Sequence, residues 1–246
     1  MSFDPSTKAV MKYAFPVSSI PTVPIAGTDL SYAVRRIYCV GRNYAEHARE
    51  MGFEPERESP FFFTKPADAI ALDGATIAYA LATQNLHHEV ELVAAIGKSG
   101  VNIARESALE HVYGYAVGID MTRRDLQLAA RDKGRPWDVG KAFDESAPIS
   151  AIHQSGEIGH PHAGAIRLSV NGQLRQNADL NQLLCPVADL VVELSRLFVL
   201  KPGDLIYTGT PAGVGPVTTG DELHGSIEGV GTITIRIGAR SAGLEP

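Results

Sequence analysis

Turn residues divide this chain into many short apolar segments, and this succession restricts its possible folds more than any other feature. Residues 36–40, 61–63, 90–96, 112–119 and 205–207 have the length and the β-branched or aromatic content of strands. Few segments show helical periodicity, and strands do not alternate regularly with helices. The sequence therefore predicts an α+β fold with a β-rich core and a few helices, not a doubly wound sheet.

Helices are expected in three places. The first runs from Asn43, which has a side chain suited to an N-cap, to about Met51. The second follows Asp120 and covers residues 122–132, where apolar residues recur at helical spacing. The third begins near Pro186, because proline suits the first turn of a helix.

Turn and loop signals set the remaining organisation. Asn171-Gly172 between two strand-like runs predicts a hairpin with a type I′ turn, and residues 52–60 read as a polar loop. Residues 1–34 are weakly patterned and interrupted by prolines, so we expect an extended N-terminal lead-in. Residues 35–246 are then expected to form a single domain.

Composition excludes several functional classes. The chain is 44% hydrophobic and 20% charged, with a net charge of −6 and scattered basic residues, so no nucleic-acid-binding surface is expected. No apolar run approaches the roughly 18 residues of a membrane span, and no signal peptide is recognisable. The two cysteines fit no disulfide or metal-binding motif. We expect a cytoplasmic protein without membrane contact.

The stretch LHHEVEL, residues 86–92, places acids at the start of a core-like strand. Side chains alternate between the faces of a strand, so Glu89 and Glu91 share one face with His87. Two adjacent carboxylates repel each other unless a cation lies between them. The pattern fits half of a metal site, and equally the polar edge of a solvent-facing strand.

Asp120, at the end of the run GYAVGID, is a candidate third carboxylate. Its side chain could alternatively cap the helix that follows. If it converges with Glu89 and Glu91, the three acids form a hard oxygen site. Such a site favours Mg²⁺, Mn²⁺ or Ca²⁺ over Zn²⁺.

His47 and Glu50 lie three residues apart on the first expected helix and so share a face. A carboxylate beside an imidazole orients the ring and raises its basicity, which makes His47 a candidate general base. The competing interpretation is an exposed surface pair.

Two further segments carry polar groups in unusual surroundings. Lys141 has apolar neighbours, so it either extends its amine to solvent or meets a negative charge. Residues 207–216 form a glycine-rich loop without a nucleotide-binding motif. The loop is either an irregular turn or a rigid segment whose amides and Thr210 hydroxyl line an anion site.

The chain resembles the fumarylacetoacetate hydrolase family, in particular its acylpyruvase branch. The similarity covers roughly residues 35–238 in the family's order. The segments that carry it are CVGRNYAEHAREMG, FFFTKPADAI, NLHHEVELVAAIGK, GYAVGIDMTRRDLQ, GRPWDVGKAFDESAPI, VNGQLRQ and GDLIYTGTPAGVGPV.

The resemblance implies a β-rich roll or sandwich with a few peripheral helices, forming one catalytic domain and usually a homodimer. It implies one Mg²⁺ or Mn²⁺ ion, with Ca²⁺ as a possible substitute in a crystal. The implied site residues are the metal ligands Glu89, Glu91 and Asp120, the catalytic residues His47, Glu50 and Lys141, and the substrate-binding residues Arg42, Gln127 and Thr210.

The implied reaction is hydrolytic carbon–carbon cleavage of an acylpyruvate, a 2-oxo acid. Residues 35–69 look most like hydrolases that convert fumarylpyruvate to fumarate and pyruvate in aromatic (gentisate) catabolism. The alternatives on the same metal site are oxaloacetate decarboxylation, a general acylpyruvase, or an isomerase and decarboxylase of the hydroxyphenylacetate pathway. A binding module without metal chemistry is the alternative of a different class.

Overall fold

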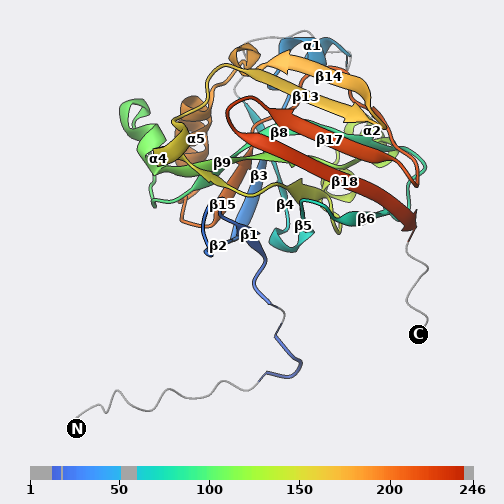
Figure 1. The fold of residues 1–246 in the computed structure, drawn as a ribbon, viewed down its shortest axis with the longest axis horizontal. Helices are drawn as coiled ribbons and strands as arrows, with labels where there is room; N and C mark the ends of the chain where they lie inside the picture. Colours follow the sequence, from blue (N-terminus) through green and yellow to red (C-terminus); the bar gives the residue numbers. More distant parts are fainter. Residues whose placement is uncertain (1–12, 18, 51–59, 241–246) are drawn as a thin grey trace.

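Two β-sheets packed face to face form the body of the protein (Figure 1). The computed structural model describes residues 13–17, 19–50 and 60–240. The larger sheet has eight strands in the order β4-β3-β15-β8-β9-β11-β5, with β12 beside β9. The second sheet has five strands in the order β14-β13-β17-β18-β6. Two small sheets complete the fold, β10-β7-β16 and the hairpin β1-β2.

The strands of the larger sheet are β3 (Arg36–Gly41), β4 (Phe61–Lys65), β5 (Ile70–Leu72), β8 (Val90–Ile96), β9 (Val112–Ile119), β11 (Ala147–Ile149), β12 (His153–Gln154) and β15 (Asp204–Tyr207). Those of the five-stranded sheet are β6 (Thr76–Tyr79), β13 (Ala165–Val170), β14 (Gln173–Asp179), β17 (Glu222–Ile227) and β18 (Gly231–Arg240). The small sheets contain β1 (Thr22–Pro24), β2 (Ser31–Ala33), β7 (Leu86–His88), β10 (Thr122–Arg123) and β16 (Gly215–Pro216).

The helices are short and lie at the periphery of the sheets (Figure 1). The α-helices are α1 (Ala45–Glu50), α2 (Arg124–Asp132), α3 (Asp138–Lys141), α4 (Ser155–Ile158) and α5 (Val187–Leu197). The described residues also contain three 3₁₀ turns, η1 (Ala67–Ala69), η2 (Arg105–His111) and η3 (Leu180–Gln182). Among the described residues, no helix has the length and apolar character that a membrane crossing requires.

Strand β8 lies at the centre of the larger sheet, and every one of its residues is buried. Val90 and Leu92 belong to the large core between the two sheets, whereas Val93 belongs to a second core on the opposite face. The alternation therefore places Glu89 and Glu91 on the face opposite Val90 and Leu92, as expected. The interpretation of this stretch as a solvent-facing polar edge is wrong.

The register between β8 and β9 brings the third acid to the other two. In this antiparallel pair Val90 lies opposite Ile119, and Glu91 lies opposite Gly118. The amide of Asp120 donates to the carbonyl of Glu89 over 2.8 Å, which continues the ladder by one residue. Adjacent positions on paired strands place side chains within contact distance, so Asp120 joins Glu89 and Glu91 on one face.

Several predicted elements are confirmed. The hairpin β13–β14 turns at Asn171 and Gly172, whose φ angles of 51° and 75° are those of a type I′ turn. Helix α2 begins at Arg124, because Thr122 and Arg123 form strand β10. Pro186 is the N-cap of α5, directly before its first turn.

The prediction that Asn43 caps the first helix is wrong. Helix α1 begins at Ala45, and the amide of Ala48 donates to the carbonyl of Tyr44. The Asn43 side chain instead donates to the carbonyls of Cys185 and Thr208 and accepts from the Cys185 amide. It therefore fastens two distant loops together. The loop expected at residues 52–60 lies outside the described residues except for Pro60.

The N-terminal lead-in is partly built into the structure. Strands β1 and β2 pair as a hairpin, and Val23, Tyr32 and Val34 are buried in the second core. Tyr32 donates its hydroxyl to the carbonyls of Ile96 and Asp204 at 2.8 Å each. Residues 13–17 and 19–21 extend away from the body (Figure 1).

Candidate active site

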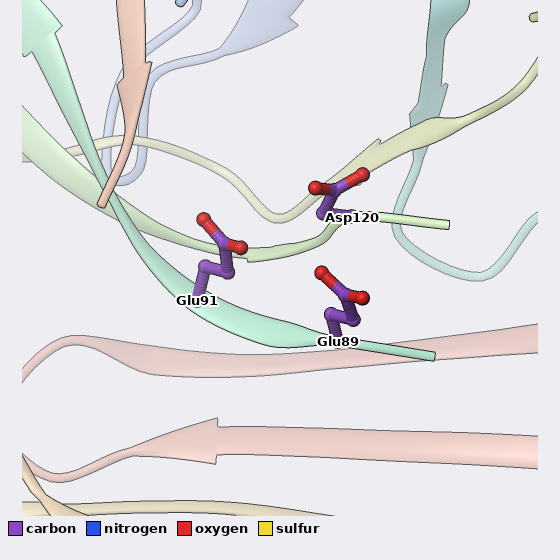
Figure 2. Close-up of side chains that lie close together, drawn as sticks. All are labelled: Glu89, Glu91 and Asp120. Atoms are coloured by element: carbon purple, nitrogen blue, oxygen red, sulfur yellow. The ribbon is translucent and has the colours of Figure 1, made fainter. Parts of the chain in front are cut away.

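Three buried carboxylates meet where β8 and β9 come together (Figure 2). Glu89, Glu91 and Asp120 are at most 4% exposed, and each offers an oxygen within 4.8 Å of an oxygen of the others. Figure 2 shows Glu89 and Glu91 on one strand and Asp120 on its neighbour. The convergence predicted for the three acids is therefore present in the folded chain.

Three buried cations surround these acids. Lys141 contacts Glu89 at 2.8 Å and Asp120 at 2.6 Å, and Lys65 contacts Asp120 at 2.8 Å. The Arg124 guanidinium pairs with the other oxygen of Glu89. Buried charges require such partners, because desolvation of an isolated ion costs several kcal/mol. Three acidic side chains thus face three basic ones.

The pKa values of the two glutamates move in opposite directions. Burial opposes ionisation of Glu89, but the Lys141 and Arg124 cations hold its pKa well below the usual range. Burial raises the pKa of Glu91 well above its ordinary value, and the Asp120 and Glu89 carboxylates add to this effect. The Gly209 amide donates to Glu91 over 2.8 Å, which offsets only part of the rise.

The three acids fit a hard divalent cation. Among the described residues Glu91 pairs with no cation, and Asp120 Oδ1 accepts no well-directed hydrogen bond although Lys65 Nζ lies 2.8 Å away. Carboxylate oxygens without imidazole or thiolate ligands favour Mg²⁺, Mn²⁺ or Ca²⁺. With all three acids ionised as ligands, their charges would balance those of the three basic side chains, and a divalent ion would add two positive charges, which suits a doubly negative substrate.

The two histidines of LHHEVEL do not join this set. Burial, with the Arg124 charge as a second cause, lowers the pKa of His87 to about 4, and the ring contacts Asn85 at 2.9 Å. His88 is buried, and its Nδ1 lies 3.1 Å from the Gln176 amide oxygen. Both rings are therefore structural neighbours of the acids.

His47 and Glu50 form the expected pair. His47 Nδ1 lies 3.1 Å from a Glu50 carboxylate oxygen, and His47 is only 7% exposed. Glu50 also accepts the Gly213 amide, at 3.1 and 3.2 Å to its two oxygens. The interpretation of this pair as a fully exposed surface contact is wrong, because the imidazole is buried and lines the pocket above the acids.

Lys141 lies on the short helix α3, with its amine directed at negative groups. Besides Glu89 and Asp120, it donates to the Thr122 hydroxyl at 2.7 Å. Burial favours loss of its proton, but the Asp120 and Glu89 carboxylates outweigh this and raise the pKa of Lys141. Of the two interpretations of its apolar neighbourhood, the meeting with negative charge is confirmed.

The glycine-rich loop is fixed to β8 by Gln176. Its amide oxygen accepts the Val90 amide at 3.0 Å, and its nitrogen donates to the Thr210 hydroxyl at 2.7 Å and to the Pro211 carbonyl at 2.9 Å. Thr210 in turn donates to the Val90 carbonyl at 2.8 Å. These hydrogen bonds hold the loop in place. Its Gly209 amide donates a hydrogen bond to Glu91.

A single pocket connects these groups. All candidate site residues except Glu50 and Asp120 line it directly. The complete lining is Val40, Gly41, Arg42, His47, Phe63, Glu89, Glu91, Arg124, Gln127, Leu128, Arg131, Trp137, Lys141 and Thr210. Arg42 has a φ of 61°, a left-handed conformation that is uncommon for residues with a side chain and that often marks a functional site.

Sequence reasoning missed Lys65, Arg124 and Gln176. Lys65 follows three phenylalanines on β4, and a lysine at the end of an apolar strand was a usable signal. Arg124 lies three residues before Gln127 on α2, to which it donates, so helical spacing could have paired them. Gln176 gives no local signal, because its partners lie more than 30 residues away.

Known proteins resemble this chain in fold and in sequence. The family model described as fumarylacetoacetate (FAA) hydrolase C-terminal matches residues 36–238. A fumarylpyruvate hydrolase from Ralstonia sp. is 48% identical over 182 residues, which are 74% of this chain and 94% of that protein. A mitochondrial oxaloacetate tautomerase from Mus musculus is 40% identical over 203 residues, 82% of this chain and 91% of that protein.

A crystal structure of fumarylpyruvate hydrolase from Pseudomonas aeruginosa, in complex with Mn²⁺ and pyruvate, superposes with a TM-score of 0.91. It is 53% identical to this chain, and the match covers 93% of this chain and all of that one. This agreement confirms the β-rich roll with few helices. The family match and the identities together show that the chain belongs to the fumarylacetoacetate hydrolase family.

Proposed function

We propose that this protein is a metal-dependent hydrolase that cleaves fumarylpyruvate into fumarate and pyruvate. The observation that carries the proposal is the buried set Glu89, Glu91 and Asp120, which opens into a pocket also lined by His47. The similarity to fumarylpyruvate hydrolases from Ralstonia and Pseudomonas aeruginosa supports this substrate.

Glu89, Glu91 and Asp120 would hold one Mg²⁺ or Mn²⁺ ion. When bound, such an ion acts as a Lewis acid that stabilises negative charge on the oxygens of a 2-oxo acid. The Mn²⁺ in the Pseudomonas aeruginosa structure supports a divalent cation for this chain.

His47 is the proposed general base. Glu50 accepts a hydrogen bond from its Nδ1, which fixes the proton on that nitrogen and presents Nε2 as the acceptor. Burial opposes ionisation of Glu50, but His47 and the Gly213 amide lower the pKa of its carboxyl, so the orienting group is an anion at neutral pH. His47 then removes a proton from water as the water oxygen attacks the carbonyl of the fumaryl group.

Attack forms a carbon–oxygen bond, and collapse breaks the bond between that carbonyl carbon and the methylene of the pyruvyl group. The electron pair leaves as pyruvate enolate, which takes up a proton to give pyruvate. Lys141, kept protonated by Glu89 and Asp120, stabilises the developing negative charge. The Gln127 amide oxygen accepts from Arg124, which orients its N–H groups as donors to substrate oxygens.

Oxaloacetate chemistry is the competing function, and the tautomerase from Mus musculus favours it. Oxaloacetate tautomerisation or decarboxylation needs a stabilised enolate but no water as nucleophile. Steady-state assays of fumarylpyruvate and oxaloacetate on one Mn²⁺-loaded preparation separate the two. The proposal requires the larger kcat/KM for fumarylpyruvate, and a clear excess for oxaloacetate overturns it.

The cellular setting is proposed on the family resemblance. We place the enzyme in the cytoplasm, in aromatic (gentisate) catabolism, and as a homodimer of single catalytic domains spanning residues 35–246 with a lead-in of residues 1–34. Light scattering at several protein concentrations tests the dimer, which a mass of one chain throughout would contradict.

A further inference from the structure

One face of helix α2 runs along the pocket from the acids outward. Arg124, Gln127, Leu128 and Arg131 all line the pocket, and their spacing of three, four and seven residues places them in one stripe. Arg124 contacts Glu89 at the inner end of the stripe. At a rise of about 1.5 Å per residue, Arg131 lies about 10 Å further along the helix axis.

The pocket also has an apolar lining. Leu128 lies between the two arginines on α2, and Phe63 and Trp137 line the same pocket with ring centroids 5.9 Å apart. Aromatic faces stack against flat conjugated groups at little conformational cost. The pocket thus combines buried charges around Glu89 with apolar and aromatic lining residues and with Arg131, about two turns along α2 from Arg124.

The distance of about 10 Å between Arg124 and Arg131 along the helix axis matches the length of the proposed substrate. Six carbon–carbon bonds separate the two carboxyl carbons of fumarylpyruvate, and an extended chain of six such bonds spans roughly 7 to 8 Å. Adding about 2 Å from a metal ion to its oxygen ligand brings the total to about 10 Å. We infer that Arg131 binds the distal carboxylate and thereby selects acylpyruvates that end in a second acid. This inference rests on the proposed function.

Two other basic side chains of the pocket already pair with one of the buried acids. Lys141 and Arg124 contact Glu89 in the buried cluster. Arg131 is 32% exposed and contacts Asp132, its sequence neighbour, whose side chain is 62% exposed. A planar guanidinium binds a carboxylate through two parallel hydrogen bonds, which suits Arg131 to this role. Arg42 is the rival group for the distal carboxylate, because it lines the same pocket from the end of β3.

The test compares kcat/KM for fumarylpyruvate with kcat/KM for acetylpyruvate, which lacks the distal carboxylate, on Mn²⁺-loaded enzyme. Arg131→Gln is expected to lower the fumarylpyruvate-to-acetylpyruvate ratio at least tenfold, mainly through KM, because a charge-assisted pair is lost. Arg131→Lys is expected to recover part of the ratio. Arg135→Gln, an exposed arginine three residues beyond the helix and outside the pocket lining, is the matched control and leaves the ratio unchanged.

Two outcomes overturn the inference while leaving the proposed function standing. One is an unchanged ratio in Arg131→Gln in an enzyme that cleaves both acylpyruvates. The other is a selective loss of fumarylpyruvate turnover in Arg42→Gln but not in Arg131→Gln. A wild-type enzyme that cleaves neither acylpyruvate overturns the proposed function, and the inference with it.

Discussion

Glu91 has the least compensated charge among the three buried acids. It accepts the Gly209 amide, whereas Glu89 and Asp120 each contact a lysine. A carboxylate without a cation is costly to bury, so its presence points to a cation that the site is built to bind. This difference makes Glu91 the residue whose replacement best separates metal binding from folding.

Glu91→Gln is expected to weaken Mn²⁺ binding at least tenfold, because the amide keeps the shape but removes an anionic ligand. Titration calorimetry measures the affinity. The thermal midpoint of the metal-free variant should not fall, because burial already favours the neutral form of Glu91 and the Gln amide is neutral as well. Glu222→Gln, which alters an exposed acid on β17, is the control, and equal affinities for the two variants would contradict the assignment.

His47→Asn is expected to lower kcat by about 10² to 10⁴, the usual contribution of a general base, with Mn²⁺ affinity unchanged. Glu50→Gln should lower kcat less, because the ring stays in place but loses its anionic partner. Glu46→Gln changes an exposed acid on the same helix and serves as control. Steady-state kinetics decide, and a His47→Asn enzyme with normal kcat would remove His47 from the mechanism.

At the scale of elements, the pairing of β8 with β9 depends on Gly118, which lies opposite Glu91. A Cβ there would lie 2.5 Å from Val93 Cγ2 and 2.6 Å from Tyr207 Cε1. A side chain at position 118 would therefore clash with the Val93 and Tyr207 side chains of the second core, on the strand that leads to Asp120.

Gly118→Ala is expected to lower the free energy of unfolding by about 1 to 3 kcal/mol, because an inserted methyl strains a packed core. Gly156→Ala on helix α4, where an added Cβ meets no atom within 4 Å, is the matched control. Chemical denaturation of the metal-free variants gives both values. A Gly118→Ala protein as stable as the control would show that the Val93 and Tyr207 side chains move aside without cost.

Local sequence patterns predicted those features of the site that local geometry determines. Alternation gave the shared face of Glu89 and Glu91, and helical spacing gave the contact of His47 with Glu50. The convergence of Asp120 needed the β8–β9 register, which periodicity alone does not encode. The family resemblance supplied it.

The basic partners of the acids also could not be predicted from local sequence patterns. Lys65 reaches Asp120 from a strand more than 50 residues earlier in the sequence, so no pattern within one segment reveals the contact. The Asn43 cap failed for a related reason: its side chain finds partners in two loops that only the tertiary fold brings near.

At the scale of the whole molecule, the acids join distant parts of the chain. The three acids lie in or next to β8 and directly after β9, and their basic partners come from β4, α2 and α3. An ion bound by the acids would bind the folded chain and not the unfolded one, so metal binding and global stability are linked.

Mn²⁺ at about 100 times its dissociation constant is expected to stabilise the fold by about 2.7 kcal/mol. For a chain of this size the thermal midpoint should then rise by about 5 to 10 °C. Calorimetric scans with Mn²⁺ and with chelator measure the difference. An equal rise in Glu91→Gln would show that the ion binds elsewhere.

The most direct test of metal-dependent hydrolysis is fumarylpyruvate turnover before and after metal removal, with fumarate and pyruvate quantified as products. Chelated enzyme should lose its activity, and Mn²⁺ added at one equivalent per chain should restore it with equal amounts of both products. Sustained fumarylpyruvate cleavage by the fully chelated enzyme would contradict the account.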